Sequence, residues 1–269
     1  MHRSSPLPPT VVLVHGAFAD TALWAGVGAL LRADGLTVRA PANPLRGLAH
    51  DAARIAGVLR GLDGPVVLVG HDYGGAVITR AAADADNVVA LCYVAGFGLD
   101  AGECVLDVVN RFAPAPVADA LVIDALVTDA RATGVPAADV RSRRGLSIRA
   151  ELFPHVYAAD LPPGEQRLLA AAQRPIACAA LAGRSGPPAW AARPSWYAIA
   201  TADRVVNPTA QRFMAQRMAA TEHLLDGSHA VALSRPEAVA GMIREAAGLG
   251  RRPLWWFPDT PREGPTRGV

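Results

Sequence analysis

The most constraining stretch of this chain is a glycine-rich turn, GHDYGG at residues 70–75, which follows the apolar run 65–69. Glycines on both sides of the centre permit a sharp, strained turn that lifts the middle side chain off the end of a strand. Such turns usually read Gly-x-Ser-x-Gly, but here the middle residue is Asp72. With serine, the pattern would indicate an ester or amide hydrolase. With aspartate, the attacking atom would be a carboxylate oxygen, which suits different bonds.

Composition narrows the class of protein further. At 269 residues the chain is long enough to bury one large core, and its net charge of +2 marks no basic face for nucleic acid. The amino terminus lacks an apolar signal segment, and no stretch is apolar for long enough to span a bilayer. The cysteines, Cys92, Cys104 and Cys178, lack metal-ligand spacing. We therefore expect a globular cytoplasmic protein with reduced thiols and without a metal site or a membrane partner.

Short apolar runs bounded by turn residues alternate with helical patterns, which is typical of parallel strands joined by helices. The predicted strands span residues 10–14, 37–40, 65–69, 88–94, 196–200 and 222–225. The predicted helices span residues 20–33, 48–61, 74–84, 208–219 and 234–247. The strands are almost entirely apolar, as in a sheet that is covered on both faces. The pattern predicts a three-layer α/β sandwich with a core formed by residues 10–99 and 192–249.

The segment 100–191 interrupts this alternation. It is alanine-rich, helical in pattern and broken by prolines, and it shows no clear strand. We expect a helical cap inserted into the core. The tail, 250–269, is rich in proline, glycine and arginine but contains Trp255 and Trp256. Adjacent tryptophans are unusual in a disordered tail, so we expect this patch to dock on its own core or on a second subunit of a homodimer.

Together these motifs resemble the α/β-hydrolase fold over residues 10–249. His15-Gly16-Ala17-Phe18, after the first strand, resembles the oxyanion loop, and the Asp72 turn resembles the nucleophile elbow. Asp203 and His229 follow the last two strands, in the order nucleophile, acid, histidine that this fold requires. The frame is most similar to the compact esterase and hydroxynitrile-lyase branch. The aspartate nucleophile is instead similar to that of epoxide hydrolases and haloalkane dehalogenases.

The resemblance implies a role for each of these residues. Asp72 would be the nucleophile, His229 the base, and Asp203 the acid that orients the imidazole. The alternative for Asp203 is a helix cap before Pro208. Asp100, after the fourth strand, is the substitute acid position in some relatives and ranks second.

Other residues complete the predicted site. The backbone N–H groups of Ala17 and Tyr73 would form the oxyanion hole. Phe18, Tyr157 and Trp190 are candidate substrate-binding residues. Tyr157 resembles the cap tyrosines that protonate an epoxide oxygen, with core packing as the alternative, whereas Trp190 could donate to a halide or simply pack. His71, which lies beside the nucleophile, is expected to pack or to orient the elbow and not to transfer protons.

The nucleophile decides between bond types. A carboxylate that attacks an ester carbonyl forms an adduct from which the carboxylate itself leaves most readily, so the reaction reverses. Attack at saturated carbon avoids this outcome and leaves an alkyl ester on Asp72. We therefore expect a hydrolase without cofactor or metal that acts with water on a small hydrophobic epoxide. The alternatives are a haloalkane or haloacid dehalogenase, an esterase or lyase, and a non-catalytic ligand-binding protein of the same fold.

Overall fold

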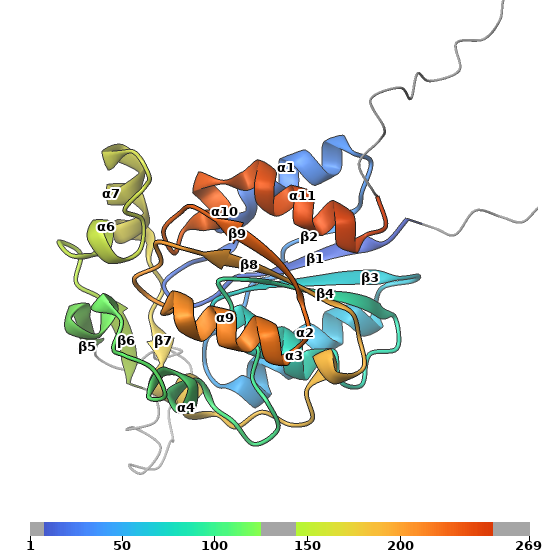
Figure 1. Cartoon of the computed structure of the whole chain (residues 1–269), viewed down its shortest axis with the longest axis horizontal. Helices are drawn as coiled ribbons and strands as arrows, with labels where there is room; N and C mark the ends of the chain where they lie inside the picture. The colour runs from blue at the N-terminus through green and yellow to red at the C-terminus, as the bar shows by residue number, and fades with distance from the viewer. Residues whose placement is uncertain (1–7, 125–143, 250–269) are drawn as a thin grey trace, which may run out of the picture.

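A parallel six-stranded sheet forms the centre of the computed structural model, which describes residues 8–124 and 144–249 (Figure 1). The strand order is β2-β1-β3-β4-β8-β9, and every neighbouring pair is parallel. The strands are β1 (Thr10–Val14), β2 (Val38–Arg39), β3 (Val66–His71), β4 (Val88–Val94), β8 (Ser195–Ala200) and β9 (Thr221–Leu225). Each strand overlaps one predicted from the sequence, so the predicted α/β architecture is confirmed.

Helices cover both faces of this sheet (Figure 1). One layer comprises α1 (Ala25–Ala33), α10 (Val231–Ser234) and α11 (Pro236–Ala246), and the other comprises α2 (Leu48–Arg60), α3 (Tyr73–Ala81) and α9 (Pro208–Arg217). Alternate strand residues supply the two cores: Val67 and Val69 pack on the α1 and α11 side, whereas Val66 and Leu68 pack on the α2 and α3 side. This double coverage explains why the strands are apolar throughout.

The segment between β4 and β8 contains short helices and a second, antiparallel sheet of order β5-β6-β7. Its strands are β5 (Leu121–Asp124), β6 (Gly145–Ile148) and β7 (Ile176–Ala177). Its helices are α4 (Val105–Val109), α6 (Phe153–Val156), α7 (Pro163–Ala172) and α8 (Cys178–Ala182), with short 3-10 turns η2 (Pro116–Ala120) and η4 (Ala189–Ala191). The prediction of a cap without strands is therefore wrong. These strands have two to four residues, too few to show an alternating pattern.

This inserted segment, which we call the cap, is bonded to loops that follow three strands of the main sheet. The N–H of Phe18, after β1, donates to the Arg174 carbonyl, and the N–H of Ala177 donates to the Leu45 carbonyl, after β2. After β9, the N–H of Ala230 donates to the Tyr157 carbonyl. Because the strands are parallel, these loops lie at one end of the sheet, where ligand sites of open α/β sheets occur.

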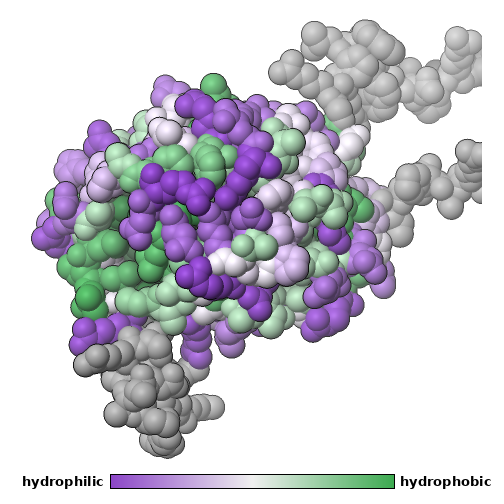
Figure 2. Space-filling model, turned by 60° about the horizontal axis from the view of Figure 1, so that its bottom comes forward, coloured by the Kyte–Doolittle hydropathy of each residue, from purple (hydrophilic) through white to green (hydrophobic). Residues whose placement is uncertain are grey.

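The surface of the cap carries exposed apolar side chains, including Leu106, Val109, Ile123 and Leu168. Figure 2 shows apolar surface on the cap side of the molecule. Among the described residues, no helix has the length and hydrophobicity needed to cross a membrane. The predicted docking patch at Trp255 and Trp256 lies outside the described residues.

Candidate active site

Asp72 lies at the junction of β3 and α3 in a strained backbone conformation. Its φ of 49° and ψ of −125° fall in a region that residues with a side chain rarely adopt. The close approach of neighbouring glycines makes this turn possible: a Cβ on Gly74 would lie 2.4 Å from the Val14 carbonyl oxygen. A Cβ on Gly16 would lie 2.5 Å from the Asp72 Cβ and Oδ2 atoms. The glycines therefore let the oxyanion loop and the elbow approach each other.

The carboxylate of Asp72 occupies the predicted oxyanion hole itself. Its Oδ2 atom accepts a hydrogen bond of 2.7 Å from the backbone N–H of Ala17. Burial raises the pKa of Asp72, while the charge of His229 and hydrogen bonds from the Tyr73 and Ala17 amides act in the opposite direction. Both predicted donors thus act on this one carboxylate, which leaves its Oδ1 atom on the side of His229.

His229 faces Asp72 and is held by Asp203. The distance from His229 Nε2 to Asp72 Oδ1 is 3.9 Å, and Nδ1 lies 2.9 Å from Asp203 Oδ2. With Nδ1 donating to this carboxylate, neutral His229 presents the lone pair of Nε2. Within the described part of the chain, Nε2 meets no hydrogen-bond partner. The structure thus brings together the three side chains that the sequence predicted as nucleophile, base and acid.

The charge of Asp203 outweighs burial at His229. Burial alone would lower the pKa of His229, but the charge and hydrogen bond of Asp203, together with the charge of Asp72, raise it. Asp203 is fixed in turn by the N–H groups of Val205 and Val206 and by the side-chain amide of Gln211, at 2.7 to 3.0 Å. Sequence reasoning missed Gln211 because its spacing from Asp203 carries no signal.

Asp100, the substitute acid candidate, is not part of this cluster. It is exposed, and its Oδ1 accepts the N–H of Ala101. Of the two candidate acids, Asp203 is therefore the one that contacts His229.

His71 is bonded to the loop that contains His229. Its Nε2 lies 3.0 Å from the His229 carbonyl oxygen, and the centroids of the two rings are 4.5 Å apart. Burial and the charge of His229 lower the pKa of His71 well below its usual value, so His71 stays neutral and Nε2–H donates. His71 thus bonds to the loop of His229, whereas the sequence led us to expect that it packs or orients the elbow.

Tyr157 from the cap lies over His229. The ring centroids are 4.8 Å apart in an edge-to-face arrangement, and Tyr157 also stacks on Phe153. Its hydroxyl is buried and has no hydrogen-bond partner among the described residues. Burial and the charges of Asp72 and Asp203 raise the pKa of Tyr157 well above its usual value. The structure thus leaves a neutral phenol O–H unpaired beside the catalytic cluster.

Of the remaining candidates, Trp190 and the Tyr73 hydroxyl are hydrogen-bonded elsewhere, and Phe18 is buried. The indole N–H of Trp190 donates to the Leu99 carbonyl at 2.9 Å, so this donor is not free for a halide. The hydroxyl of Tyr73 donates to Asp51 Oδ2 at 2.8 Å, away from the site, which leaves only its backbone N–H to act on Asp72. Phe18 is buried beside Ala17 with a φ of 58°.

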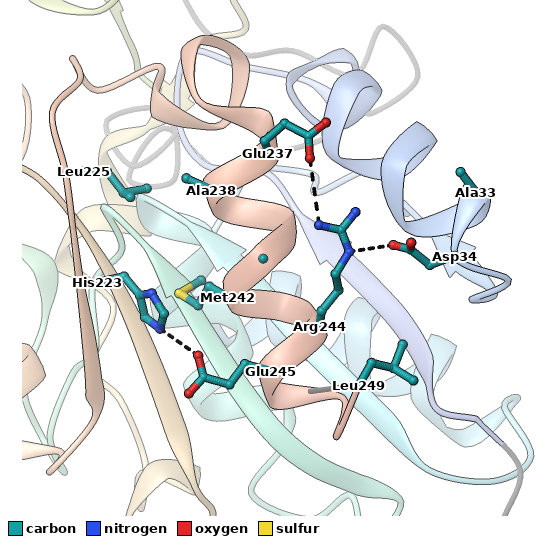
Figure 3. Close-up of a pocket in the computed structure, with 11 residues that line it drawn as sticks. Ala33, Asp34, His223, Leu225, Glu237, Ala238, Met242, Arg244, Glu245 and Leu249 are labelled. Atoms are coloured by element: carbon teal, nitrogen blue, oxygen red, sulfur yellow. Dashed lines mark hydrogen bonds and ion pairs between the residues drawn. The ribbon is translucent and has the colours of Figure 1, made fainter. Parts of the chain in front are cut away.

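A pocket of about 910 Å³ lies away from this cluster, between α1, β9 and α11 (Figure 3). Its polar side chains lie close to one another: Arg244 bonds Asp34 at 2.6 Å and lies 3.8 Å from Glu237, and His223 lies 3.1 Å from Glu245. Because none of the triad residues lines it, we do not assign it to the reaction. In the described ranges, no three side chains are grouped as metal ligands would be.

Solved structures with this architecture include several esterases. A pyrethroid hydrolase from Sphingobium faniae JZ-2 is 24% identical with a TM-score of 0.71, over 89% of this chain and 97% of that one. A methylesterase from Arabidopsis is 19% identical with a TM-score of 0.69, over 90% and 99%. Polyneuridine aldehyde esterase is 16% identical with a TM-score of 0.72, over 87% and 97%. At these identities the similarity establishes the fold alone.

A comparison with curated protein sequences finds no match. The model of one protein family, described as the alpha/beta hydrolase family, matches residues 11–242. This match covers most of the chain and includes the oxyanion loop, the elbow, Asp203 and His229. The chain therefore belongs to the alpha/beta hydrolase family.

Proposed function

We propose that this protein is an epoxide hydrolase that uses Asp72 as a covalent nucleophile. The observation that carries the proposal is the placement of the two carboxylate oxygens. Oδ2 is bound by the Ala17 N–H, whereas Oδ1 lies beside the free Nε2 of His229. A carboxylate held by one oxygen in this way presents the other for attack at carbon, and the held oxygen is already in the oxyanion hole for the second step.

In the first step, Asp72 Oδ1 attacks a ring carbon of the epoxide and forms a C–O bond. The ring C–O bond breaks, and its electron pair goes to the departing oxygen. This oxygen takes the proton of the Tyr157 hydroxyl, because an alkoxide is generally more basic than a phenolate. The product of this step is a hydroxyalkyl ester of Asp72 and a Tyr157 phenolate.

In the second step, His229 takes a proton from water, and the hydroxide attacks the ester carbonyl carbon. The negative charge develops on Oδ2, which the Ala17 and Tyr73 amides stabilise. The tetrahedral adduct expels the diol oxygen, which takes the proton from His229. The proton left on the new Asp72 carboxyl group returns to Tyr157 through His229, so the enzyme is restored and one water is consumed.

Ester hydrolysis is the second candidate, favoured by the names of the structural neighbours. It would require water, activated by His229, to attack the substrate ester directly. The Ala17 N–H already donates to Asp72, so the oxyanion hole is not free for a substrate carbonyl. Dehalogenation ranks lower still, because the Trp190 indole is bonded to Leu99. We therefore place epoxides first.

Trapping of the ester intermediate tests this proposal. His229→Gln removes the base of the second step and leaves Asp72 and Tyr157 in place, so the intermediate should persist. We expect mass spectrometry to find one epoxide added to the peptide that contains Asp72. His155→Gln, which changes an exposed histidine, should turn over without such an adduct. Epoxide turnover by the unmodified protein with no adduct on the His229 variant would refute the covalent route. Turnover of aryl esters but not epoxides would favour ester hydrolysis.

A further inference from the structure

The cap is bonded to the chain on both sides of His229. On the C-terminal side of His229, the N–H of Ala230 donates to the Tyr157 carbonyl at 3.0 Å. On its N-terminal side, the hydroxyl of Ser228 lies 2.5 Å from Asp160 Oδ1 and 3.2 Å from the same Tyr157 carbonyl. A hydroxyl has one proton to donate, and the shorter contact to a charged acceptor takes it. Ser228 is therefore tied chiefly to Asp160.

Asp160 and Ser228 meet in a closely packed part of the structure. Ser228 is 2% exposed, and a Cβ on Gly227 would lie 3.1 Å from Asp160 Oδ2. Burial acts to raise the pKa of Asp160, but hydrogen bonds from the hydroxyl and N–H of Ser228, from the Ser234 hydroxyl and from the N–H of Asp160 itself outweigh it, and the net shift is downward. The carboxylate thus stays ionised and remains an acceptor through the neutral range. Asp160 belongs to the cap, between α6 and α7, and Ser228 belongs to the core, after β9.

These contacts have no part in the bond-making steps. The side chain of His229 is fixed by Asp203 and its carbonyl by His71, but neither contact reaches the cap. The Asp160–Ser228 hydrogen bond instead joins the residue that precedes His229 to the cap. Tyr157, by contrast, is held by stacking on Phe153 and by its own N–H bond to the Phe153 carbonyl.

We propose that Asp160 and Ser228 form a positioning pair that places His229 for hydrolysis of the ester intermediate. This inference rests on the proposed function, because it concerns the second chemical step. Without the hydrogen bond, the loop after β9 would keep its backbone bond from Ala230 to Tyr157 but lose its side-chain bond to Asp160, and Nε2 would spend less time in line with the ester carbonyl. A small misplacement of a catalytic group is enough to slow a reaction substantially. Alkylation of Asp72, which does not use the base, would be affected little.

The proposal predicts a kinetic pattern that a general loss of stability would not produce. When only the second of two covalent steps slows, kcat and KM fall together and kcat/KM is unchanged. We expect Ser228→Ala, which removes the hydrogen bond to a charged group, to lower kcat and KM by about tenfold. Asp160→Asn removes the charge but keeps an amide oxygen as acceptor, so it should lower both constants by a smaller factor. The ester on the Asp72 peptide should then accumulate during turnover. The double variant should be no slower than Ser228→Ala, because Ser228→Ala already removes the contact.

Asp226→Asn is the matched control, since it removes an exposed carboxylate from the same loop and should leave kcat and KM unchanged. The positioning role is overturned if Asp160→Asn and Ser228→Ala keep kcat, or if they lower kcat/KM without accumulating ester. His229→Gln separates this outcome from failure of the proposed function. An adduct on that variant without one on the positioning variants refutes the pair alone, whereas no adduct on any variant refutes the covalent mechanism. If Asp160→Asn does not fold, Ser228→Ala decides.

Discussion

At the scale of single residues, burial of the carboxylate of Asp72, the proposed nucleophile, lowers the stability of the fold. Asp72 is 3% exposed, and burial raises its pKa above the usual 3.8. A raised pKa means that the folded chain binds this proton more tightly than the unfolded chain does. The ionised form therefore destabilises the fold above pH 3.8, and this effect disappears as the pH falls toward that value.

Replacing Asp72 with asparagine should thus stabilise the protein while it abolishes the reaction. We expect a gain of about 1 kcal/mol at neutral pH, or roughly 2–4 °C in Tm, and a smaller gain at pH 4. Thermal melts followed by circular dichroism at both pH values measure it. An Asp72→Asn protein that kept full turnover without deamidation would remove Asp72 from the mechanism. A Tm gain that did not shrink at low pH would contradict the role of its charge.

The pKa of His229, the proposed base, depends on Asp203, and the pH dependence of kcat should detect this. Asp203 keeps the pKa of His229 raised against the effect of burial, and His229 must be neutral to activate water. In Asp203→Asn, burial would lower this pKa, so the acidic limb of the kcat profile should move to lower pH. We also expect kcat to fall by about 10³–10⁴-fold, because the imidazole loses its orienting partner. An acidic limb that stayed in place would show that another group controls it.

At the scale of elements, the β3–α3 elbow depends on glycine for close packing. An alanine at position 74 would place its Cβ 2.4 Å from the Val14 carbonyl, a backbone atom that cannot move aside without distorting β1. A Cβ at Gly241 in α11 would meet nothing within 4 Å. The two positions thus give a matched pair of glycine-to-alanine changes.

We expect Gly74→Ala to destabilise the fold by roughly 3 kcal/mol or more, because it introduces a buried backbone clash. Gly241→Ala should instead stabilise it by about 0.5–1 kcal/mol through the higher helix propensity of alanine. Urea denaturation of both variants provides the comparison. Equal effects of the two changes would contradict the packing described for the elbow.

The sequence predicted the main elements well because their signals are local and repeated. Long apolar runs identified β3 and β4, and the GHDYGG turn located the elbow between β3 and α3. The predicted helix over 20–33 begins as a 3-10 turn, η1 (Thr21–Trp24), before α1. The cap sheet was missed because its strands are very short and pair across long separations in sequence, which no local pattern reveals.

The site was predictable only in part for the same reason. Asp72, Asp203 and His229 follow strand ends that the fold brings together, so chain order located them. The supporting contacts, such as Gln211 on Asp203 and Asp51 on the Tyr73 hydroxyl, arise from tertiary packing. The sequence also did not reveal the hydrogen bond from the Trp190 indole to Leu99, because this bond depends on how η4 packs against the loop after β4.

At the scale of the whole molecule, the proposed reaction would require the cap and the core together. The core supplies Asp72, His229 and Asp203, whereas the cap supplies Tyr157, whose buried hydroxyl has no hydrogen-bond partner among the described residues. Loss of this hydroxyl breaks no hydrogen bond with those residues, so it should change the reaction more than the stability.

Tyr157→Phe should therefore lower kcat/KM for epoxides by about 10²-fold or more, through loss of the proton donor, without lowering Tm. Tyr93→Phe provides the control, because the Tyr93 hydroxyl bonds Thr79 at 2.9 Å in the core. That variant should lose about 1 kcal/mol of stability and keep its kcat/KM. Steady-state kinetics and thermal melts of both proteins test this contrast. A Tyr157→Phe protein with unchanged kcat/KM would show that another group protonates the epoxide oxygen.

The central claim is that Asp72 itself attacks the substrate, and a single-turnover reaction in water enriched in oxygen-18 tests it most directly. With enzyme in excess over an epoxide, the oxygen added to the attacked carbon should come from Asp72. The first-turnover diol should then contain no oxygen-18, while the peptide that contains Asp72 gains the label. A first-turnover diol that carries oxygen-18, with Asp72 unlabelled, would show that water attacks directly and would contradict the account.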